Sequence, residues 1–566
     1  MTSLESKRRS KPAFTRLGPL FLFGLPLLFL LVFFFNPLFA VFRLALQSGT
    51  SAGQNGWSLV LRPLGFTIGQ ALLSTLLTLL VGLPAAFMFA RFDFPGKRLL
   101  QALTTLPFIL PTVVVAAGFN ALLGPRGWMN LGLMGIFNLE TPPIQILNTL
   151  AAILLAHVFY NTTIVIRLVG SAWAQMDVRL EAAARTLGAS PLQALREVTL
   201  PLLRPSILAA TLLVFLFDFT SFGVILLLGG PHFSTLEVEI YVQALQMLNL
   251  PVASLLSAIQ MACTLVLTLL YSRLAGNRDI PLAPHLHGEA TRPARRWSER
   301  VMIGVLVVTM LLLLVSPLAA LAARSFTRLD ADRGVHATVA PTLTLDYYRE
   351  LFINRQQSAF YVPPIEAVRN SLIYALVTTF ISTVLGFVAA YALAKRTTSA
   401  RILDAMLMLP LGASAVTLGL GFLLVFNRPP LDVRSLPVLI PIAHSLVALP
   451  FVVRTLLPAI AAIPPHLREA AAVLGASPWQ VWRKIDLPIL TRAVLVSAIF
   501  SFTISLGEFG ATSFLARPEY PTIPLAIYRF LSQPGALNYG QALAMATLLM
   551  GVCALSVLLM QRLDHK

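Results

Sequence analysis

Runs of about 20 apolar residues recur along the whole chain and are separated by shorter polar segments. At 1.5 Å per residue, a helix of that length crosses a hydrocarbon core of about 30 Å. The runs are continuous and show no alternation of apolar and polar residues, which favours helices over the strands of a membrane barrel. The pattern predicts twelve spans, at roughly 18–42, 64–90, 102–123, 149–172, 205–228, 252–272, 301–323, 368–394, 402–426, 436–457, 492–515 and 541–561.

The composition agrees with a membrane protein, because 57% of the 566 residues are hydrophobic and only 12% are charged. A net charge of +18 would also suit a nucleic-acid-binding protein, but the basic residues gather in the segments expected on the cytoplasmic side. The segment 229–250, expected on the opposite side, contains Glu237 and Glu239 and no basic residue. We therefore expect a multi-pass membrane protein with both termini cytoplasmic, lipid as its surroundings and no nucleic-acid partner.

The chain repeats itself at an offset of 287 residues. EAAARTLGASPLQALREVTLP (181–201) corresponds to EAAAVLGASPWQVWRKIDLP (469–488), and SFG (221–223) corresponds to EFG (508–510). Upstream of these segments the offset becomes 303 or 304, so the first half carries an extra segment near 124–147.

Each half therefore holds six spans in the same orientation. Parallel repeats imply a pseudo-two-fold axis along the membrane normal, with a shared pathway on that axis. The predicted fold class is an all-α integral membrane protein of twelve transmembrane helices in two parallel six-helix repeats. We expect the first repeat at 1–273, a cytoplasmic linker at 274–299 and the second repeat at 300–566.

Catalytic and metal-binding signatures are absent from the sequence. No GxxxxGK[ST] motif is present, so ATP hydrolysis would belong to a separate subunit. Cys263 and Cys553 each stand alone in an apolar span, and His285 and His287 lie in the polar linker, where such a pair usually binds nothing. We expect no metal, no cofactor and no enzymatic activity in this chain.

The repeated segment lies between the fourth and fifth spans, in loops 173–203 and 458–490. Its composition predicts a helix that ends at Gly188 or Gly475, followed by a second helix that starts at a Ser-Pro pair. A short helix held clear of the bilayer fits a groove on a soluble partner. The alternative is a hairpin that only stabilises the bundle.

The second copy of this segment resembles the EAA loop of bacterial ABC-importer permeases, the coupling helix that seats in the cleft of a cytoplasmic ATPase subunit. Glu469, Ala470, Gly475 and Pro488 carry the resemblance, which extends from about residue 60 to the end of the chain. It implies a MetI-like fold, a place in a bacterial plasma (inner) membrane, two copies of the ATPase subunit and an extracytoplasmic solute-binding protein.

The first copy departs from the pattern. Gly188 and Pro201 match it, but Glu181 stands one residue early and Ala182 occupies the equivalent of Glu469. Either Glu181 reaches the partner from one position earlier, or the first coupling helix lacks that contact.

Two carboxylates at membrane depth are candidates for the solute pathway, because an ionisable group there is costly. Asp218 and Ser221 in the first half correspond to Ser505 and Glu508 in the second, so each half offers one carboxylate and one serine. We expect the four to face a common cavity, although bonds to neighbouring helices would also explain them. Carboxylates favour a cation over an oxyanion. Phe217, Phe219, Phe222 and Phe509 are candidates to stack on such a cation, and the equivalent residues His157 and His444 are expected to serve packing or hydrogen bonding.

Fused twelve-span permeases of this kind occur for thiamine and for ferric iron, and the segments 226–245 and 251–260 look most like the thiamine permease. Thiamine is therefore the first expected substrate and ferric iron the second. From other classes, an ATP-independent secondary carrier is disfavoured by the paired coupling loops, and an intramembrane enzyme by the lack of a nucleophile with a base.

Overall fold

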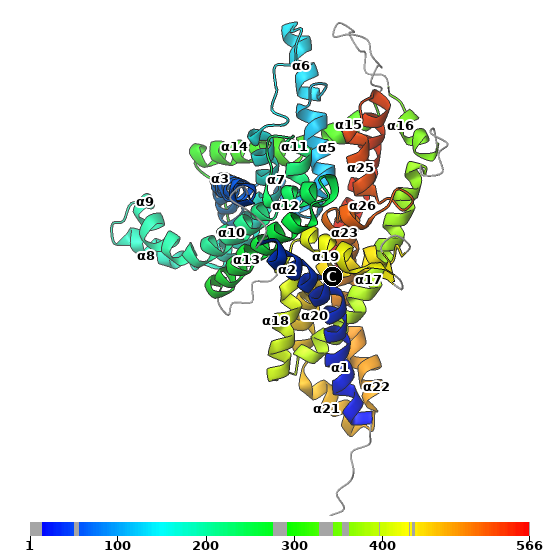
Figure 1. The fold of residues 1–566 in the computed structure, drawn as a ribbon. Helices are drawn as coiled ribbons and strands as arrows, with labels where there is room; N and C mark the ends of the chain where they lie inside the picture. Colours follow the sequence, from blue (N-terminus) through cyan, green and yellow to red (C-terminus); the bar gives the residue numbers. More distant parts are fainter. Residues whose placement is uncertain are drawn as a thin grey trace, which may run out of the picture.

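The computed structural model describes residues 14–49, 56–275, 291–327, 343–353, 362–395, 397–428, 431–432 and 436–564, and these are almost entirely helical (Figure 1). His285 and His287 lie outside the described residues. In the first half the elements are α1 (Phe14–Leu30), the π-helical η1 (Leu31–Phe35), α2 (Asn36–Gly49), α3 (Gly56–Arg91), β1 (Phe92–Asp93), α4 (Lys97–Ile109), α5 (Thr112–Leu123), α6 (Trp128–Phe137), α7 (Leu150–Gln175), α8 (Val178–Thr186), α9 (Pro191–Ala194), the π-helical η2 (Leu195–Thr199), α10 (Leu200–Phe219), α11 (Gly223–Leu228), α12 (Leu236–Tyr241), the π-helical η3 (Val242–Gln246) and α13 (Leu250–Ala275). In the second half they are β2 (Arg292–Pro293), α14 (Trp297–Leu314), α15 (Ser316–Ser325), α16 (Asp346–Arg349), the 3₁₀ turn η4 (Glu350–Phe352), α17 (Pro364–Leu393), α18 (Thr398–Gly412), α19 (Ala415–Val425), β3 (Asn427–Arg428), β4 (Leu431–Asp432), α20 (Leu439–Ala461), α21 (Pro465–Val473), α22 (Pro478–Val481), the π-helical η5 (Trp482–Asp486), α23 (Leu487–Gly507), α24 (Gly510–Leu515), α25 (Ile523–Ser532) and α26 (Ala536–Asp564).

Two short strand pairs accompany the helices. β1 pairs in parallel with β2, and β3 pairs antiparallel with β4. The pairing of β1 with β2 ties the end of the linker to the residues that follow α3. Residues 124–147, the extra segment of the first half, contain α6, which protrudes from the body (Figure 1).

The spans confirm the predicted fold class, with one correction to their shape. Among the described residues, ten helices are long and apolar enough to cross a membrane, and counting each of two bent pairs as one span gives twelve. The bent pairs are the predicted spans 102–123 and 402–426. They turn by 113° where α4 meets α5 and by 99° where α18 meets α19.

Local chemistry explains both bends. Leu110 is extended (ψ 137°) because the residue before a proline avoids the α region, and Pro111, which is also extended (ψ 141°), directly precedes the first residue of α5. In the second half Ala413 is extended, and the hydroxyl of Ser414 caps α19 by accepting a hydrogen bond from the N–H of Thr417. Proline and serine thus produce the same bend in the two halves by different means.

The fifth span of each half is also shorter than predicted. The runs 205–228 and 492–515 are apolar throughout, yet α10 ends at Phe219 and α23 ends at Gly507. The short helices α11 and α24 follow after a break in the chain. The residues in these breaks form the site described below.

Equivalent tertiary contacts support the repeat. The hydroxyl of Thr67 accepts a hydrogen bond from the N–H of Leu236 (2.9 Å), and Ser371 does the same for Ile523 (2.8 Å). These bonds attach the starts of α12 and α25 to α3 and α17. The contacts hold equivalent elements in equivalent places, although the residues differ.

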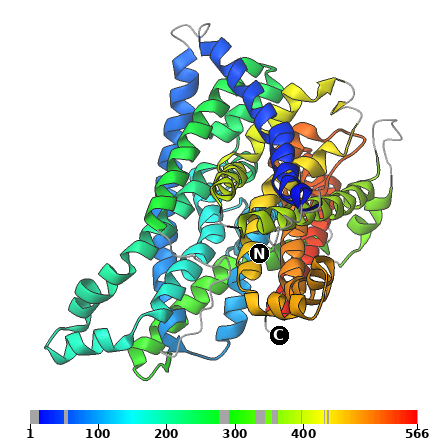
Figure 2. The ribbon, with the colours of Figure 1, turned by 90° about the horizontal axis from the view of Figure 1, so that it is seen from below.

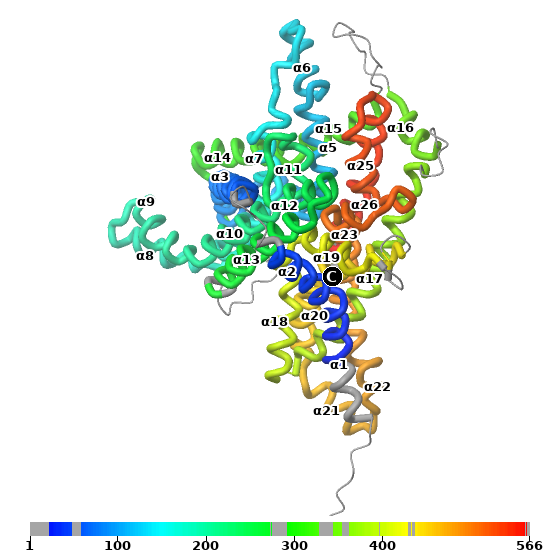
Figure 3. The backbone as a smooth tube through the Cα atoms, viewed as in Figure 1, coloured from blue at the N-terminus to red at the C-terminus, as the bar shows by residue number. Residues whose placement is uncertain are grey.

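The first helices of each half reach across to the other half. α1 packs against α17 and α18, and α2 lies between α19 of the second half and α13 of its own. α14 packs against α3 and α4, and α15 lies between α5 of the first half and α26 of its own. Figure 2 shows the dark-blue N-terminal helix beside the yellow and orange helices of the second half, and Figure 3 follows the same path as a tube. Each half therefore supports the other.

Candidate functional site

A cavity of about 390 Å³ lies at the interface of the two halves. This volume falls within the range of about 300–1,000 Å³ typical of small-molecule sites. Asp218, Ser221 and Glu508 line it, whereas Ser505 is buried beside it and does not. The structure therefore brings three of the four candidate pathway residues to one cavity, and no lysine or arginine is among the described residues that line it.

In the first half, His157 joins the end of α10 to the break that follows it. Its Nδ1 lies 2.9 Å from the hydroxyl of Ser74 and 3.4 Å from Oδ1 of Asp218, and its Nε2 lies 2.8 Å from the hydroxyl of Ser221. Asn161 donates a hydrogen bond of 2.7 Å to the same Oδ1. Oδ2 of Asp218 is buried and has no hydrogen-bond partner among the described residues.

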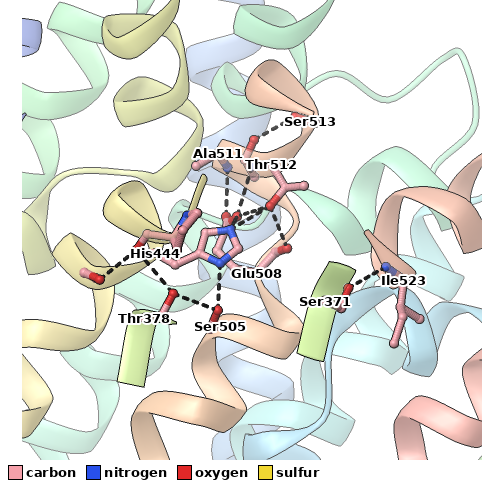
Figure 4. Close-up of polar contacts among 12 residues, drawn as sticks. Ser371, Thr378, His444, Ser505, Glu508, Ala511, Thr512, Ser513 and Ile523 are labelled. Carbon is pink, nitrogen blue, oxygen red and sulfur yellow. Dashed lines mark hydrogen bonds and ion pairs between the residues drawn. The ribbon is translucent and has the colours of Figure 1, made fainter. Parts of the chain in front are cut away.

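In the second half, His444 occupies the equivalent place (Figure 4). Its Nδ1 lies 2.8 Å from the hydroxyl of Ser505, and its Nε2 lies 2.8 Å from the hydroxyl of Thr512 and 3.1 Å from Oε2 of Glu508. Ser505 in turn donates a hydrogen bond of 3.1 Å to Thr378, the counterpart of Ser74. Both histidines are engaged in hydrogen bonds inside the bundle, as expected.

The carboxylate stands on opposite sides of the two histidines. In the first half it lies on the Nδ1 side, on the last turn of α10, and in the second it lies on the Nε2 side, in the break before α24. In each half the serine occupies the position that the carboxylate holds in the other half. The two networks thus share one scaffold, with the acid and the serine exchanged.

The two carboxylates differ in how fully they are bonded. Oε1 of Glu508 accepts a hydrogen bond from the N–H of Ala511 (2.8 Å), and Oε2 accepts from the N–H (3.0 Å) and hydroxyl (2.7 Å) of Thr512. Glu508 therefore caps the N-terminus of α24, where a negative charge is stabilised. Asp218 retains a free oxygen, so it is the better candidate to contact a solute.

A third carboxylate lines the cavity and was missed as a pathway candidate in the sequence. Glu237, on α12, accepts a hydrogen bond from the hydroxyl of Ser414 (2.8 Å) and another from the side-chain amide of Gln260. It is buried and connects the first half to the bend of the second. In the sequence, Glu237 is one of two acidic residues in the segment 229–250, which is expected outside the membrane. The alternation in TLEVEIY, with one glutamate on each side of Val238, was the available signal that one of them faces inward.

Two aromatic rings meet in the same cavity. Phe222 and Phe509 stack with ring centroids 5.4 Å apart and planes inclined by 22°. Phe217 also lines the cavity, where it contacts the ring of Phe108 edge-on, whereas Phe219 is buried away from it. The cavity thus combines acidic and aromatic groups, which suits an organic cation.

The repeated loops have the predicted helix, glycine and helix. α8 ends at Thr186 and α21 at Val473, and two residues later Gly188 and Gly475 turn the chain with left-handed φ angles of 96° and 81°. Ser190 and Ser477 then form capping boxes at the starts of α9 and α22. Pro201 and Pro488 come directly after the π-helical turns η2 and η5, inside the continuous helices 191–219 and 478–507, and such π turns are a common local adjustment where a proline interrupts the helical hydrogen bonds. Both loops project from the body of the molecule (Figure 1).

The projecting loops expose large apolar side chains at equivalent positions. Leu187 and Leu474 are 89% and 87% exposed, and Leu192 and Trp479 are also exposed. Ala182, Glu469 and Ala470 are exposed on the same segments, and Glu469 has no hydrogen-bond or ion-pair partner among the described residues. Apolar residues that stand clear of the bundle are typical of a docking surface.

In the described part of the chain, no group of three or more His, Cys, Asp or Glu side chains lies close enough together to hold a metal ion. Cys263 and Cys553 are separate free thiols.

A repeated six-helix bundle, a cavity between its halves and two projecting helical loops define a membrane permease that works with soluble partners. The profile of the family described as binding-protein-dependent transport system inner membrane components matches residues 79–279 and 372–566. These matches cover more than half of the chain, one in each half. The chain belongs to this family and is the permease subunit of an ABC transporter, with an ATPase and a binding protein as general partners.

Among curated proteins, the chain is similar to the thiamine transport system permease protein ThiP of Escherichia coli (strain K12), at 28% identity over 84% of each chain. ThiP of Brucella abortus (strain 2308) is 28% identical over 95% of this chain and 93% of its own length. A probable ABC transporter permease protein of Sinorhizobium fredii (strain NBRC 101917 / NGR234) is 27% identical over 88% of this chain and 87% of its own.

Proposed function

We propose that the chain is the permease of an ABC importer for a small organic cation, with thiamine as the substrate. The observation that carries this proposal is the cavity between the halves, which three carboxylates and two stacked aromatic rings line, with no lysine or arginine among its described lining residues. An oxyanion would instead need hydrogen-bond donors and basic side chains. The relatives described as thiamine permeases support the same choice.

Asp218 is the proposed contact for the positive charge of the solute. Its free Oδ2 is buried against the cavity, and an unpaired carboxylate there is costly unless a cation passes. Ser221 lies on the same wall, while Ser505 and Glu508 hold His444 and the start of α24 in place. Phe222 and Phe509 would offer their faces to an aromatic cation once they separate.

Transport would proceed by alternating access. In this proposal the first repeat spans 1–273, the linker 274–299 and the second repeat 300–566, with both termini cytoplasmic. Two ATPase subunits dock on the loops at α8–α9 and α21–α22, at Gly188 and Gly475 and their neighbours. Their closure on ATP would rotate the halves about the pseudo-two-fold axis, and an extracytoplasmic binding protein would deliver the solute.

The test is uptake of labelled thiamine into proteoliposomes that contain this chain, its ATPase and its binding protein. We expect accumulation that requires ATP in the compartment facing the loops and that unlabelled thiamine suppresses. Ferric iron and molybdate, added as unlabelled competitors, should leave uptake unchanged. Uptake without ATP would favour a secondary carrier, and accumulation of labelled ferric iron but not of thiamine would establish the other substrate.

A further inference from the structure

The two coupling loops carry different charges at equivalent positions. Glu181 on α8 corresponds to Arg468 on α21, and Ala182 corresponds to Glu469. Two identical ATPase subunits would therefore meet two unlike surfaces. The contacts of these residues within the permease decide which of them remain available.

Glu181 is bound to its own bundle. Its Oε2 accepts a hydrogen bond of 2.8 Å from the guanidinium of Arg91, the last residue of α3. The side chain of Arg91 is only 9% exposed and that of Glu181 is 31% exposed. An ion pair with one largely buried partner is screened less than one on the surface, so this pair can hold α8 against the body.

In the second half an ion pair also attaches the loop to the bundle, but there the loop residue is basic and its partner is acidic. Arg468 donates a hydrogen bond of 2.8 Å to Oδ1 of the buried Asp486, whose Oδ2 accepts another from the hydroxyl of Tyr391 (3.1 Å). The bond to Asp486 raises the pKa of the Arg468 guanidinium. The equivalent of Arg91 is Lys395, which Arg468 would repel.

The sequence changes on the two sides are mutually consistent. In the first half the loop carries the acid Glu181, and Arg91 at the end of α3 pairs with it. The residue of η2 that is equivalent to Asp486 is the uncharged Thr199. Where the loop carries arginine, the turn η5 supplies Asp486 instead. Position 181/468 is thus the anchor of each coupling loop to its bundle, and its charge is matched from a different element in each half.

We infer that Glu181 positions the first coupling loop and does not contact the ATPase, so that of the two glutamates in the repeated EAA segments only Glu469 offers the ATPase a free carboxylate. On α21 Glu469 is exposed and lies one turn before the exposed Val473 and Leu474. On α8 the corresponding Ala182 is uncharged, and the exposed charges there are Arg179 and Arg185. Because the two ATPase subunits are identical, a basic side chain in their groove would pair with Glu469 on the second surface and would find no such partner at Ala182 on the first.

This inference rests on the proposed docking of an ATPase, so its experiment has one part that needs no ATPase. In the purified permease, hydrogen–deuterium exchange of residues 178–186 reports whether α8 is held. We expect Glu181→Gln to raise this exchange, and the reversed pair Arg91→Glu with Glu181→Arg to return it toward the wild-type rate. If Glu181→Gln leaves the exchange of residues 178–186 unchanged, Glu181 does not hold α8 and the inference is wrong.

The second part measures binding of the co-expressed ATPase subunit to the permease in nanodiscs at low and high salt. We expect Glu469→Gln to weaken binding about tenfold and to reduce its salt dependence, because it removes a charged contact at the interface. Glu181→Gln should weaken binding less, and the reversed pair should restore it.

A reversed pair that binds as poorly as Glu181→Gln would show that Glu181 touches the ATPase, and the inference would be wrong. The matched pair Arg468→Asp with Asp486→Arg should behave in the same way as the first reversed pair. Binding that is unchanged in every variant would count against docking at these loops, and hence against the proposed function, while the exchange measurement still decides the anchor.

Discussion

Phe222 and Phe509 occupy equivalent positions in the two halves and stack on each other, with ring centroids 5.4 Å apart. A contact between equivalent residues marks the pseudo-two-fold axis, because only a group near that axis can meet its own counterpart. Both rings line the cavity and stand next to Ser221 and Glu508 in the chain. Any motion that separates the halves at this level must part the two rings.

Linking these two positions should stop transport. In a background without Cys263 and Cys553, the pair Phe222→Cys and Phe509→Cys, joined by a short bifunctional thiol reagent, should lower thiamine uptake to background. Reduction of a cleavable linker should restore uptake. The two single-cysteine variants treated alike are the controls, and full uptake by the linked protein would show that the rings need not separate.

Removing the charge of Asp218 should weaken the interaction with the solute. Asp218→Asn keeps the shape of the side chain but loses the charged acceptor, and a charged hydrogen bond of about 1.5–3 kcal/mol corresponds to a rise in KM of about tenfold or more. The measurement is the concentration dependence of thiamine uptake in proteoliposomes. Asp346→Asn, at an exposed site on α16, is the control and should leave KM unchanged.

Glu508 is expected to act mainly on stability. Glu508→Gln removes the charge that caps α24 and lies beside His444. We expect the free energy of unfolding of the purified permease to fall by about 1 kcal/mol, the value of a helix cap, and the unfolding temperature to fall with it. Thermal unfolding in detergent, followed by loss of monodispersity, measures it. A variant as stable as the wild type but with a raised KM would assign Glu508 to the solute instead.

Close helix packing at Gly82 should not tolerate a larger residue. A Cβ at Gly82 would lie 2.7 Å from Cβ of Val165, and one at the equivalent Gly386 would lie 2.5 Å from Cγ1 of Val452. Overpacking of this kind costs about 1–3 kcal/mol, so Gly82→Ala should lower the unfolding temperature. Gly69→Ala on the same helix has open space around it and should not.

The left-handed turn at Gly475 should be needed for ATPase docking. Gly475 has a φ of 81°, and a Cβ added there would meet no atom within 4 Å, so the restriction comes from the backbone conformation, at about 1–2 kcal/mol for an ordinary residue. Gly475→Val should therefore misplace α22 and weaken ATPase binding in nanodiscs. Gly475→Asn, which tolerates this conformation, should bind nearly as well as the wild type, and equal loss in both variants would point to a side-chain effect.

The sequence by itself determined the class of the protein, most of its spans and the helix–glycine–helix form of its two repeated loops. These features depend on local properties, namely runs of apolar residues, an ungapped internal repeat and turn residues such as Gly188 and Ser190. The break at Pro111 was also visible locally, because a proline and its preceding residue resist the α region. The matching bend at Ser414 was not, because a serine cap is compatible with many conformations.

Only the tertiary structure decided which polar residues act together. Asp218 and Glu508 look alike as isolated carboxylates in apolar spans, but the chain breaks there, and only Glu508 finds every bond filled. Glu181 resembles a displaced coupling residue until Arg91, ninety positions earlier, is seen to bind it. Glu237 reaches the cavity because Thr67 holds the start of α12. Such partners are distant in sequence, and their pairing depends on how the helices pack, which no local pattern records.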